Sequence, residues 1–78
     1  MSRIPQTNSE IISAFGKGRF GEICGFKRYP SQRANDMMRR DSINGRHWPA
    51  IVAAAQEAGL PITYEVLAMA QQKAKAAA

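Results

Sequence analysis

The chain has 78 residues, a formal net charge of +5 at pH 7 and one cysteine. We expect a chain of this length to form one domain spanning 1–78, and a single thiol excludes an internal disulfide and argues against a cysteine-based zinc site. The sequence shows no signal-peptide pattern and no apolar run long enough for a membrane span, so we expect a cytoplasmic protein without membrane contact.

The positive charge is unevenly distributed along the chain. Residues 1–46 hold nine basic and four acidic residues, whereas residues 47–78 hold two of each. Such an asymmetry indicates one half that faces a polyanion and a neutral half that supports it. The alternative is that the basic residues serve only to keep a small protein soluble.

The first predicted element is a helix over residues 8–15, after a flexible start over 1–6. Thr7 and Glu10 have the spacing of a capping box, which begins a helix. Ile11, Ile12 and Phe15 then share one helical face, and Gly16 permits a left-handed ending.

A second short helix is predicted over residues 19–24, after a connection at 17–18. Gly25 allows a sharp turn, and the apolar Phe26 is expected to tuck beneath it. Residues 27–30 form a predicted loop because Pro30 disfavours helix at the residue before it. Ser31 is expected to cap a third helix over 32–40, with an inner face of Ala34, Met37 and Met38.

Two further helices complete the predicted fold. Ile43 is expected to anchor the intervening loop, and Asn44 to cap a helix over about 46–58 that ends at Gly59. Thr63 is expected to cap the last helix, from 64 to about 75. The predicted buried positions of these two helices are Trp48, Ile51, Val52, Ala55, Val66, Leu67 and Ala70. No strand-type alternation occurs, so the expected class is all-α with five helices.

Residues 19–40 have the layout of a helix-turn-helix unit, with a helix, a glycine turn and a second helix. Gly21 is small enough to let the two helices approach closely. The turn is longer than usual, because five residues, 26–30, separate Gly25 from Ser31. This insert is basic and aromatic, which predicts a loop that reaches phosphates beside a DNA groove.

The sequence also contains a second pattern of residues between positions 39 and 63. It comprises Arg39-Arg40, Ile43, Arg46-His47-Trp48-Pro49-Ala50-Ile51, Ala53–Ala55, Gly59 and Ile62-Thr63. Over residues 9–69 the chain resembles the small Cro-like or YdaS-like helix-turn-helix regulators, most closely the "carph-isopro" type of alphaproteobacteria, their phages and mobile elements. The resemblance implies a compact Cro/lambda-repressor-like domain. Met37 stands where that family often has Trp, and Asn44-Gly45 replaces its usual Pro-Ala.

Position and resemblance together assign candidate roles to the polar residues. Arginine, asparagine and glutamine side chains read base edges, whereas most basic side chains contact phosphates. The candidates for base contacts are Gln32, Arg33, Asn35 and Asp36. The candidates for phosphate contacts are Arg19, Lys27, Arg28, Tyr29, Ser31, Arg39, Arg40 and Arg46. The candidates for a dimer surface, on residues 46–75 that support the unit, are Val66, Leu67, Met69 and Ala70.

Other interpretations of single residues are weaker. Asp36 is more consistent with orienting an arginine than with accepting from cytosine. His47 is the only histidine and has no partner at ligand spacing, which favours a structural or phosphate-adjacent role over a metal site. Trp48 fits a core position, and Cys24 fits an inert buried thiol. We expect no enzyme activity, no metal, no cofactor and no small-molecule ligand.

The resulting prediction is a sequence-specific regulator of transcription, a repressor or dual-function switch of a phage or mobile element. It would bind double-stranded DNA as a homodimer on a repeat operator, in the bacterial nucleoid. Two alternatives remain open: a DNA-bending accessory factor of the excisionase type, and a protein-binding antirepressor module that uses the methionine-rich face of residues 32–40.

Overall fold

The computed structural model describes residues 4–77, and in that range all regular secondary structure is helical, with no strand. This confirms the all-α class and the number of five α-helices. The elements are α1 (Asn8–Phe15), α2 (Lys17–Ile23), α3 (Pro30–Arg40), the single 3-10 turn η1 (Gly45–His47), α4 (Trp48–Ala58) and α5 (Tyr64–Ala77).

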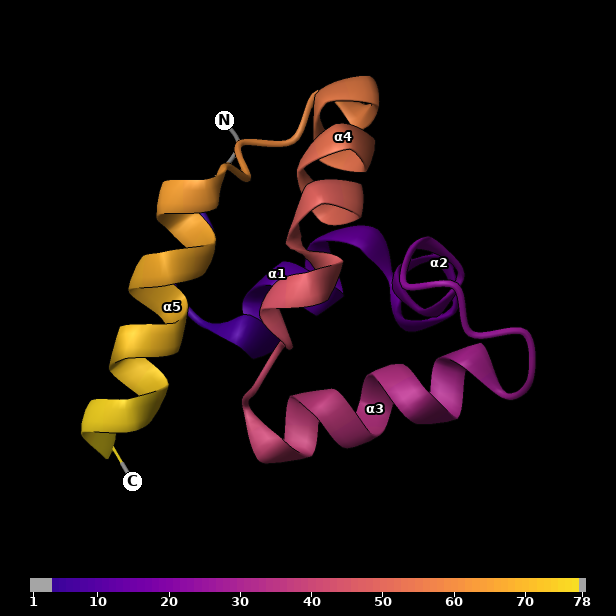
Figure 1. Ribbon diagram of the computed structural model, residues 1–78, viewed down its shortest axis with the longest axis horizontal. Coiled ribbons are helices and arrows are strands. Elements are labelled where there is room, and N and C mark those ends of the chain that lie inside the picture. Colours follow the sequence, from indigo (N-terminus) through magenta and orange to yellow (C-terminus); the bar gives the residue numbers. More distant parts are fainter. Residues whose placement is uncertain (1–3, 78) are drawn as a thin grey trace.

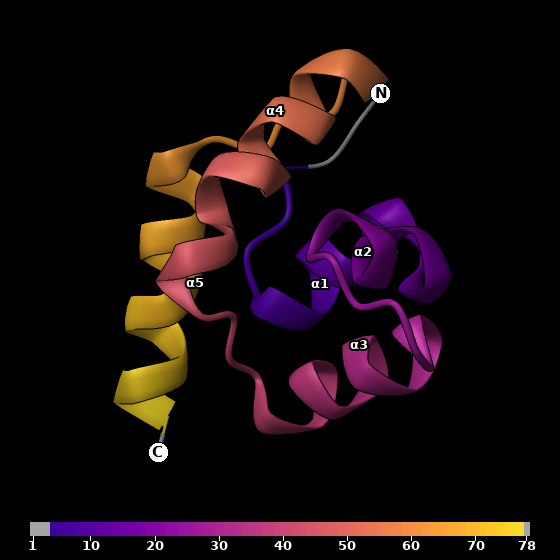
Figure 2. The ribbon, with the colours of Figure 1, turned by 45° about the vertical axis from the view of Figure 1, so that its right-hand side comes forward.

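The helices are arranged around α1, which contacts α2, α3 and α5 (Figure 1). α4 contacts α2 and α5 and so links these two helices. α3 runs along the bottom of the view in Figures 1 and 2, and among the described helices it contacts only α1 and α2. Most of the surface of α3 is therefore free of other helices.

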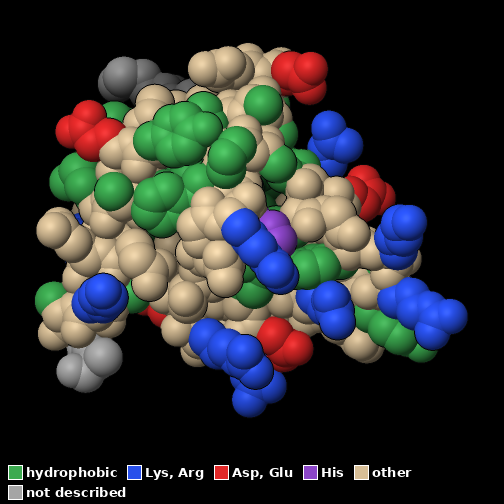
Figure 3. All heavy atoms as spheres, viewed as in Figure 1, with side chains coloured by type: hydrophobic (Ala, Val, Ile, Leu, Met, Phe, Trp, Pro, Cys, Tyr) green, Lys and Arg blue, Asp and Glu red, His purple; other side chains and the backbone are tan. Residues whose placement is uncertain are grey.

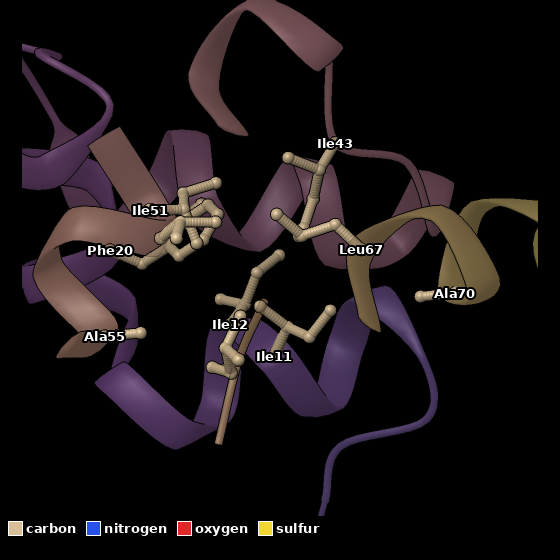
Figure 4. Close-up of a cluster of buried hydrophobic side chains, with 11 residues drawn as sticks. Ile11, Ile12, Phe20, Ile43, Ile51, Ala55, Leu67 and Ala70 are labelled. Atoms are coloured by element: carbon tan, nitrogen blue, oxygen red, sulfur yellow. The ribbon is translucent and has the colours of Figure 1, made fainter. Parts of the chain in front are cut away.

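The hydrophobic core lies between α1, α2, α4 and α5, with Ala34 as the one fully buried residue of α3 (Figure 4). Ile11, Ile12 and Phe20 are completely buried and meet side chains from distant segments. As predicted, Ile43 points into this core from the loop after α3. Trp48 is only half-buried and packs against the edge of the core, which is less than its predicted burial.

α1 begins and ends where the sequence predicts. The Thr7 side chain accepts a hydrogen bond from the Glu10 amide at 3.1 Å, which satisfies one of the free donors in the first turn. Gly16 ends the helix with a φ of 90°, a conformation that strongly favours glycine.

The predicted starts of the next two helices are wrong by two residues each. α2 begins at Lys17, because Gly16 alone reverses the chain and its carbonyl accepts from the Phe20 amide at 2.8 Å. α3 begins at Pro30. Proline suits the first position of a helix, because an amide hydrogen there would have no partner within the helix and proline has none. Ser31 therefore lies inside the first turn, and Tyr29 occupies the cap position assigned to Ser31.

The caps of the remaining elements follow the prediction more closely. Asn44 Oδ1 accepts from the Arg46 amide at 3.0 Å, but the turn that it opens is η1, and α4 starts only at Trp48. Gly59 ends α4 with a φ of 71°. Thr63 Oγ1 accepts from the Val66 amide at 3.3 Å at the start of α5.

The predicted flexible start, 1–6, is described only from residue 4, so residues 1–3 lie outside the described range. The remainder, residues 4–6, is not a free tail. Pro5 is buried, and Lys73 Nζ of α5 donates to Gln6 Oε1 at 2.9 Å. This short segment therefore lies against α5.

Candidate nucleic-acid interface

The outward face of α3 carries the four candidates for base contacts. Ala34 is buried, and Met37 and Met38 are half-buried, so this side of α3 faces α1 and α2. Helical periodicity places Gln32 and Asp36 on the opposite side, with Arg33 and Asn35 on the two flanks. Gln32, Arg33 and Asp36 are exposed, and Asn35 is half-buried.

The N-terminal end of α3 is held by close contact with α2. Gly21 is buried against Pro30, and a Cβ at position 21 would overlap the backbone carbonyl of Pro30. The sequence prediction that Gly21 permits close approach is confirmed. No other residue type leaves this space free, so Gly21 sets the distance between α2 and the start of α3.

The C-terminal end of α3 is held by polar groups of α1. Ser9 Oγ donates to the Met38 carbonyl at 3.2 Å, and Asn8 Nδ2 donates to the Asp41 carbonyl at 2.7 Å. The Asn8 side chain is almost completely buried and also lies 3.4 Å from Gln71 Oε1 of α5. Carbonyls at the end of a helix have no partner within the helix, so these bonds both satisfy them and fix the direction of α3.

The loop between α2 and α3, residues 24–29, projects three consecutive exposed side chains: Lys27, Arg28 and Tyr29. Gly25 turns the chain with a φ of 85°, and the Phe26 amide donates to the Gly21 carbonyl at 3.0 Å. Tyr29 has a φ of 52° and a ψ of 50°, and 69% of its side chain is exposed. A left-handed conformation costs a non-glycine residue roughly 1–2 kcal/mol.

Arg33 is positioned by an aromatic side chain of this loop. Its guanidinium carbon lies 4.9 Å from the centre of the Phe26 ring, within the range of a cation–π interaction. The same ring meets His47 of η1 edge-on, with 5.7 Å between the ring centres. Arg33 therefore lies toward η1 and away from the middle of the outer face of α3.

Basic side chains gather on one side of the molecule. In Figure 3 the Lys and Arg side chains lie mainly over α3 and the loop before it, whereas hydrophobic and neutral atoms cover much of the area over α4 and α5. Within residues 4–77 the sole ion pair is Arg19 with Glu22, at 3.8 Å. The other basic side chains of that range are not neutralised by a carboxylate, and Asp36 orients no arginine there.

The structure brings most phosphate candidates around α3. Lys27, Arg28, Tyr29 and Ser31 are exposed at its N-terminal end, Arg39 and Arg40 at its C-terminal end, and Arg46 on η1. Arg19 is the exception. It pairs with Glu22 and lines surface hollows with Glu57 of α4, so it lies apart from the outer face of α3.

The sequence prediction missed two features of this surface, the place of Lys17 and the aromatic contact that holds Arg33. Lys17 lines a shallow hollow together with Ser31, Gln32, Asn35 and Asp36, although the sequence suggested only a connection there. Phe26 and His47 support Arg33 from segments that are far apart in the chain. No local sequence signal reports either arrangement, because both depend on how α2 and η1 pack.

The four dimer candidates divide into two groups. Leu67 and Ala70 are buried in the core of the single chain, with 0% and 1% exposure. This corrects their assignment to a dimer surface, because α5 uses its most apolar face to close its own domain. Met69 is exposed and Val66 half-exposed, and both line an apolar hollow between residues 4–6 and α5.

Features that would support other chemistry are weak. Cys24 is half-buried, which is less than its predicted burial, and burial raises the pKa of its thiol to about 11. The thiol is therefore protonated at neutral pH. Residues 4–77 contain no group of three metal-binding side chains. No helix of the described chain is long and apolar enough to cross a bilayer.

Comparisons with known proteins add no relative from which a function could be transferred. No protein-family model, no curated protein and no solved structure matches this chain significantly.

Proposed function

We propose that the chain is a sequence-specific, double-stranded DNA-binding regulator of transcription. In this proposal α2 and α3 form a helix-turn-helix unit with a long turn, and α3 enters the major groove. The observation that carries the proposal is the outer face of α3, which is polar, free of other helices and bordered at both ends by unpaired cations. An α-helix fits the major groove, and cations on either side of it contact the two phosphate strands.

The geometry also favours base contacts for some residues of α3 and phosphate contacts for others. Gln32, Asn35 and Asp36 lie together around the hollow beside Lys17, where base edges would be read. Arg33 is held on the other flank by Phe26, which suits a phosphate contact better than a base contact. Lys27, Arg28, Arg39 and Arg40 then contact the backbone at the two ends of the helix.

The resemblance to Cro-like regulators extends the proposal to a lambda-repressor-like domain of a phage or mobile element. Proteins of this kind bind repeat operators as dimers whose half-sites are one helical turn apart. The exposed Met69 and the hollow beside it are the apolar surface of α5 available for such pairing. Occupancy of a promoter would then repress transcription or switch it.

The proposal is tested by selecting duplexes from a random pool and measuring affinity for the selected and a scrambled sequence. We expect strong salt dependence for both and a much higher affinity for the selected duplex. Equal affinity for both sequences would contradict the sequence-specific role, and strong bending of the duplex would favour an accessory factor. No binding even at low salt would favour a protein-binding module.

The assignment of phosphate contacts is tested with the double variant Arg39→Ala/Arg40→Ala. Each lost phosphate contact lowers the slope of log affinity against log salt by about 0.9, so we expect a decrease of about 2. Affinity for selected and scrambled duplexes should fall by a similar factor. The control is Lys75→Ala on α5, which removes a cation from an exposed site away from α3 and should leave the slope much less affected. An equal effect for each charge removed would mean that only net charge matters.

A further inference from the structure

The aromatic contact that holds Arg33 also brings the only histidine of the chain to the candidate interface. Phe26 lies between two elements, with the Arg33 guanidinium over its ring and the His47 ring in a T-shaped contact with it. Arg46, the neighbour of His47 in η1, is exposed. We call Phe26, Arg33, Arg46 and His47 the Phe26 cluster.

We propose that the Phe26 cluster is a phosphate-binding site in which His47 takes up a proton when DNA binds. This inference rests on the proposed function, since the phosphate belongs to the DNA backbone. Arg33 and His47 contact the Phe26 ring, and Arg46 directly precedes His47. The cluster therefore holds two guanidinium groups and one imidazole, which are donors that phosphate oxygens prefer. Figure 3 shows the histidine (purple) at the surface among Lys and Arg side chains.

The charged groups placed beside His47 in the free protein are cations. Arg46 precedes it in η1 and lowers its pKa, and Arg33 of α3 contacts the same Phe26 ring. The first two turns of α4 carry no titratable side chain. In the described part of the chain no carboxylate lies within 4.0 Å of the His47 ring nitrogens, and Asp36 belongs to the outer face of α3.

This environment disfavours the charged form of His47 in the free protein. Burial and, secondarily, the charge of Arg46 lower the pKa of His47 below its usual 6.5. A phosphate placed against the cluster reverses the sign of the local potential and raises the pKa of His47, because an opposite charge stabilises the imidazolium. Binding therefore takes up a proton at every pH between the free and the bound pKa.

The consequence is an affinity that increases as the pH falls. Above the bound pKa His47 is neutral in both states and contributes no charge. Between the two pKa values the affinity increases by up to about tenfold for each pH unit, and below the free pKa it reaches a plateau. Histidine is the side chain whose ordinary pKa falls in this window, so the effect is specific to this residue.

The experiment compares the native chain with His47→Gln, which keeps a hydrogen-bond donor but does not titrate. The dissociation constant of a selected duplex is measured from about pH 8 to about pH 5.5 at constant ionic strength. We expect the native chain to gain about tenfold in affinity for each unit by which DNA raises the pKa of His47. His47→Gln should lack this gain, and any pH dependence that it retains reports other groups, such as the α-amino group.

A second measurement follows His47 directly, by NMR of its ring protons in the free protein and in the complex. We expect the midpoint of its titration to move to higher pH in the complex, and Phe26→Leu to reduce this movement because Arg33 and His47 lose their shared support. Circular dichroism at each pH verifies that the chain is folded. Stability declines as the pH falls below about 6.5, since the unfolded chain then binds more protons.

The outcomes separate this inference from the proposed function. Sequence-specific binding with identical pH dependence in the native chain and His47→Gln overturns the inference and leaves the regulator role intact. An unchanged His47 titration in a complex that forms normally has the same meaning. A folded chain that binds no duplex at low salt overturns both.

Discussion

The basic surface around α3 and the neutral half formed by α4 and α5 use their residues in opposite ways. α4 and α5 contribute Ile51, Val52, Ala55, Leu67 and Ala70 to the core, whereas α3 contributes only Ala34 as a fully buried residue. α3 is instead held at its two ends, by Gly21 against Pro30 and by hydrogen bonds from Asn8 and Ser9. Its outer face is therefore not needed for folding.

The backbone conformation at the helix ends also differs between α3 and α4. The two non-glycine residues with positive φ among the described residues, Tyr29 and Asp41, lie directly before and directly after α3. α4 ends on a glycine, where the same conformation costs little. Strain that native packing tolerates is found preferentially at functional sites, so its position at both ends of α3 supports the assignment of this helix to binding.

The largest expected effect tests whether the neutral half provides the stability. Leu67→Ala removes a completely buried side chain, and such changes cost about 2–5 kcal/mol of unfolding free energy. The total free energy of unfolding of a domain of this size is only a few kcal/mol, so we expect most molecules of this variant to be unfolded at 25 °C. Chemical denaturation measures the loss.

Met69→Ala on the same helix is the matched control. Its side chain is 57% exposed, so the free energy of unfolding of a single chain should change little. A loss of stability that depends on protein concentration would instead show that Met69 is buried between two copies. A large concentration-independent loss at Met69, with little effect at Leu67, would contradict the described core.

The next effect tests how α3 is positioned. Gly21→Ala places a methyl group on the Pro30 carbonyl, and overpacking of this kind costs about 1–3 kcal/mol. Because the start of α3 must move, DNA affinity should also fall in molecules that remain folded. The control is Gly45→Ala, since a Cβ at position 45 would meet no atom within 4 Å and the φ of Gly45 is not positive. Helix propensity alone would stabilise both variants, because alanine favours a helix more than glycine does. A loss at Gly21→Ala that is no larger than the loss at Gly45→Ala would therefore contradict the role of the contact with Pro30.

The smallest effect separates stability from binding at a single residue. Tyr29→Gly removes the strain of the left-handed conformation, worth roughly 1 kcal/mol, and we expect a slightly higher melting temperature. The same change removes an exposed side chain from the candidate interface, so DNA affinity should fall. Tyr64→Ala, at another exposed tyrosine of the neutral half, should leave affinity unchanged. A Tyr29→Gly variant with lower stability and unchanged affinity would show that Tyr29 serves the fold.

Sequence reasoning was most successful where a single turn of chain decides the structure. The caps at Thr7, Asn44 and Thr63 and the glycine ends at Gly16 and Gly59 follow from backbone donors, acceptors and allowed dihedrals within four residues. It failed at the start of α3, where a proline-containing turn was compatible with either a loop or a first helical turn. Packing of Pro30 on Gly21 decides between the two.

The exposure of the candidate site residues was predicted correctly for most positions, because charged side chains remain at the surface in any fold of this size. The grouping of these residues in space was not predicted correctly. The separation of Arg19 from the surface around α3, the burial of Leu67 and Ala70 and the contact of Arg33 with Phe26 all depend on residues far apart in the chain.

For this protein, composition and local patterning are sufficient for the all-helical class, the bounds of α1 and the division into a basic and a neutral half. These properties arise from interactions within a few residues or from simple counts of charge. Only the tertiary structure decides that α3 keeps an open polar face and that His47 and Arg33 contact the same Phe26 ring. Both depend on α1, α2 and η1 meeting in space, and the distances between elements that are remote in sequence are set by packing.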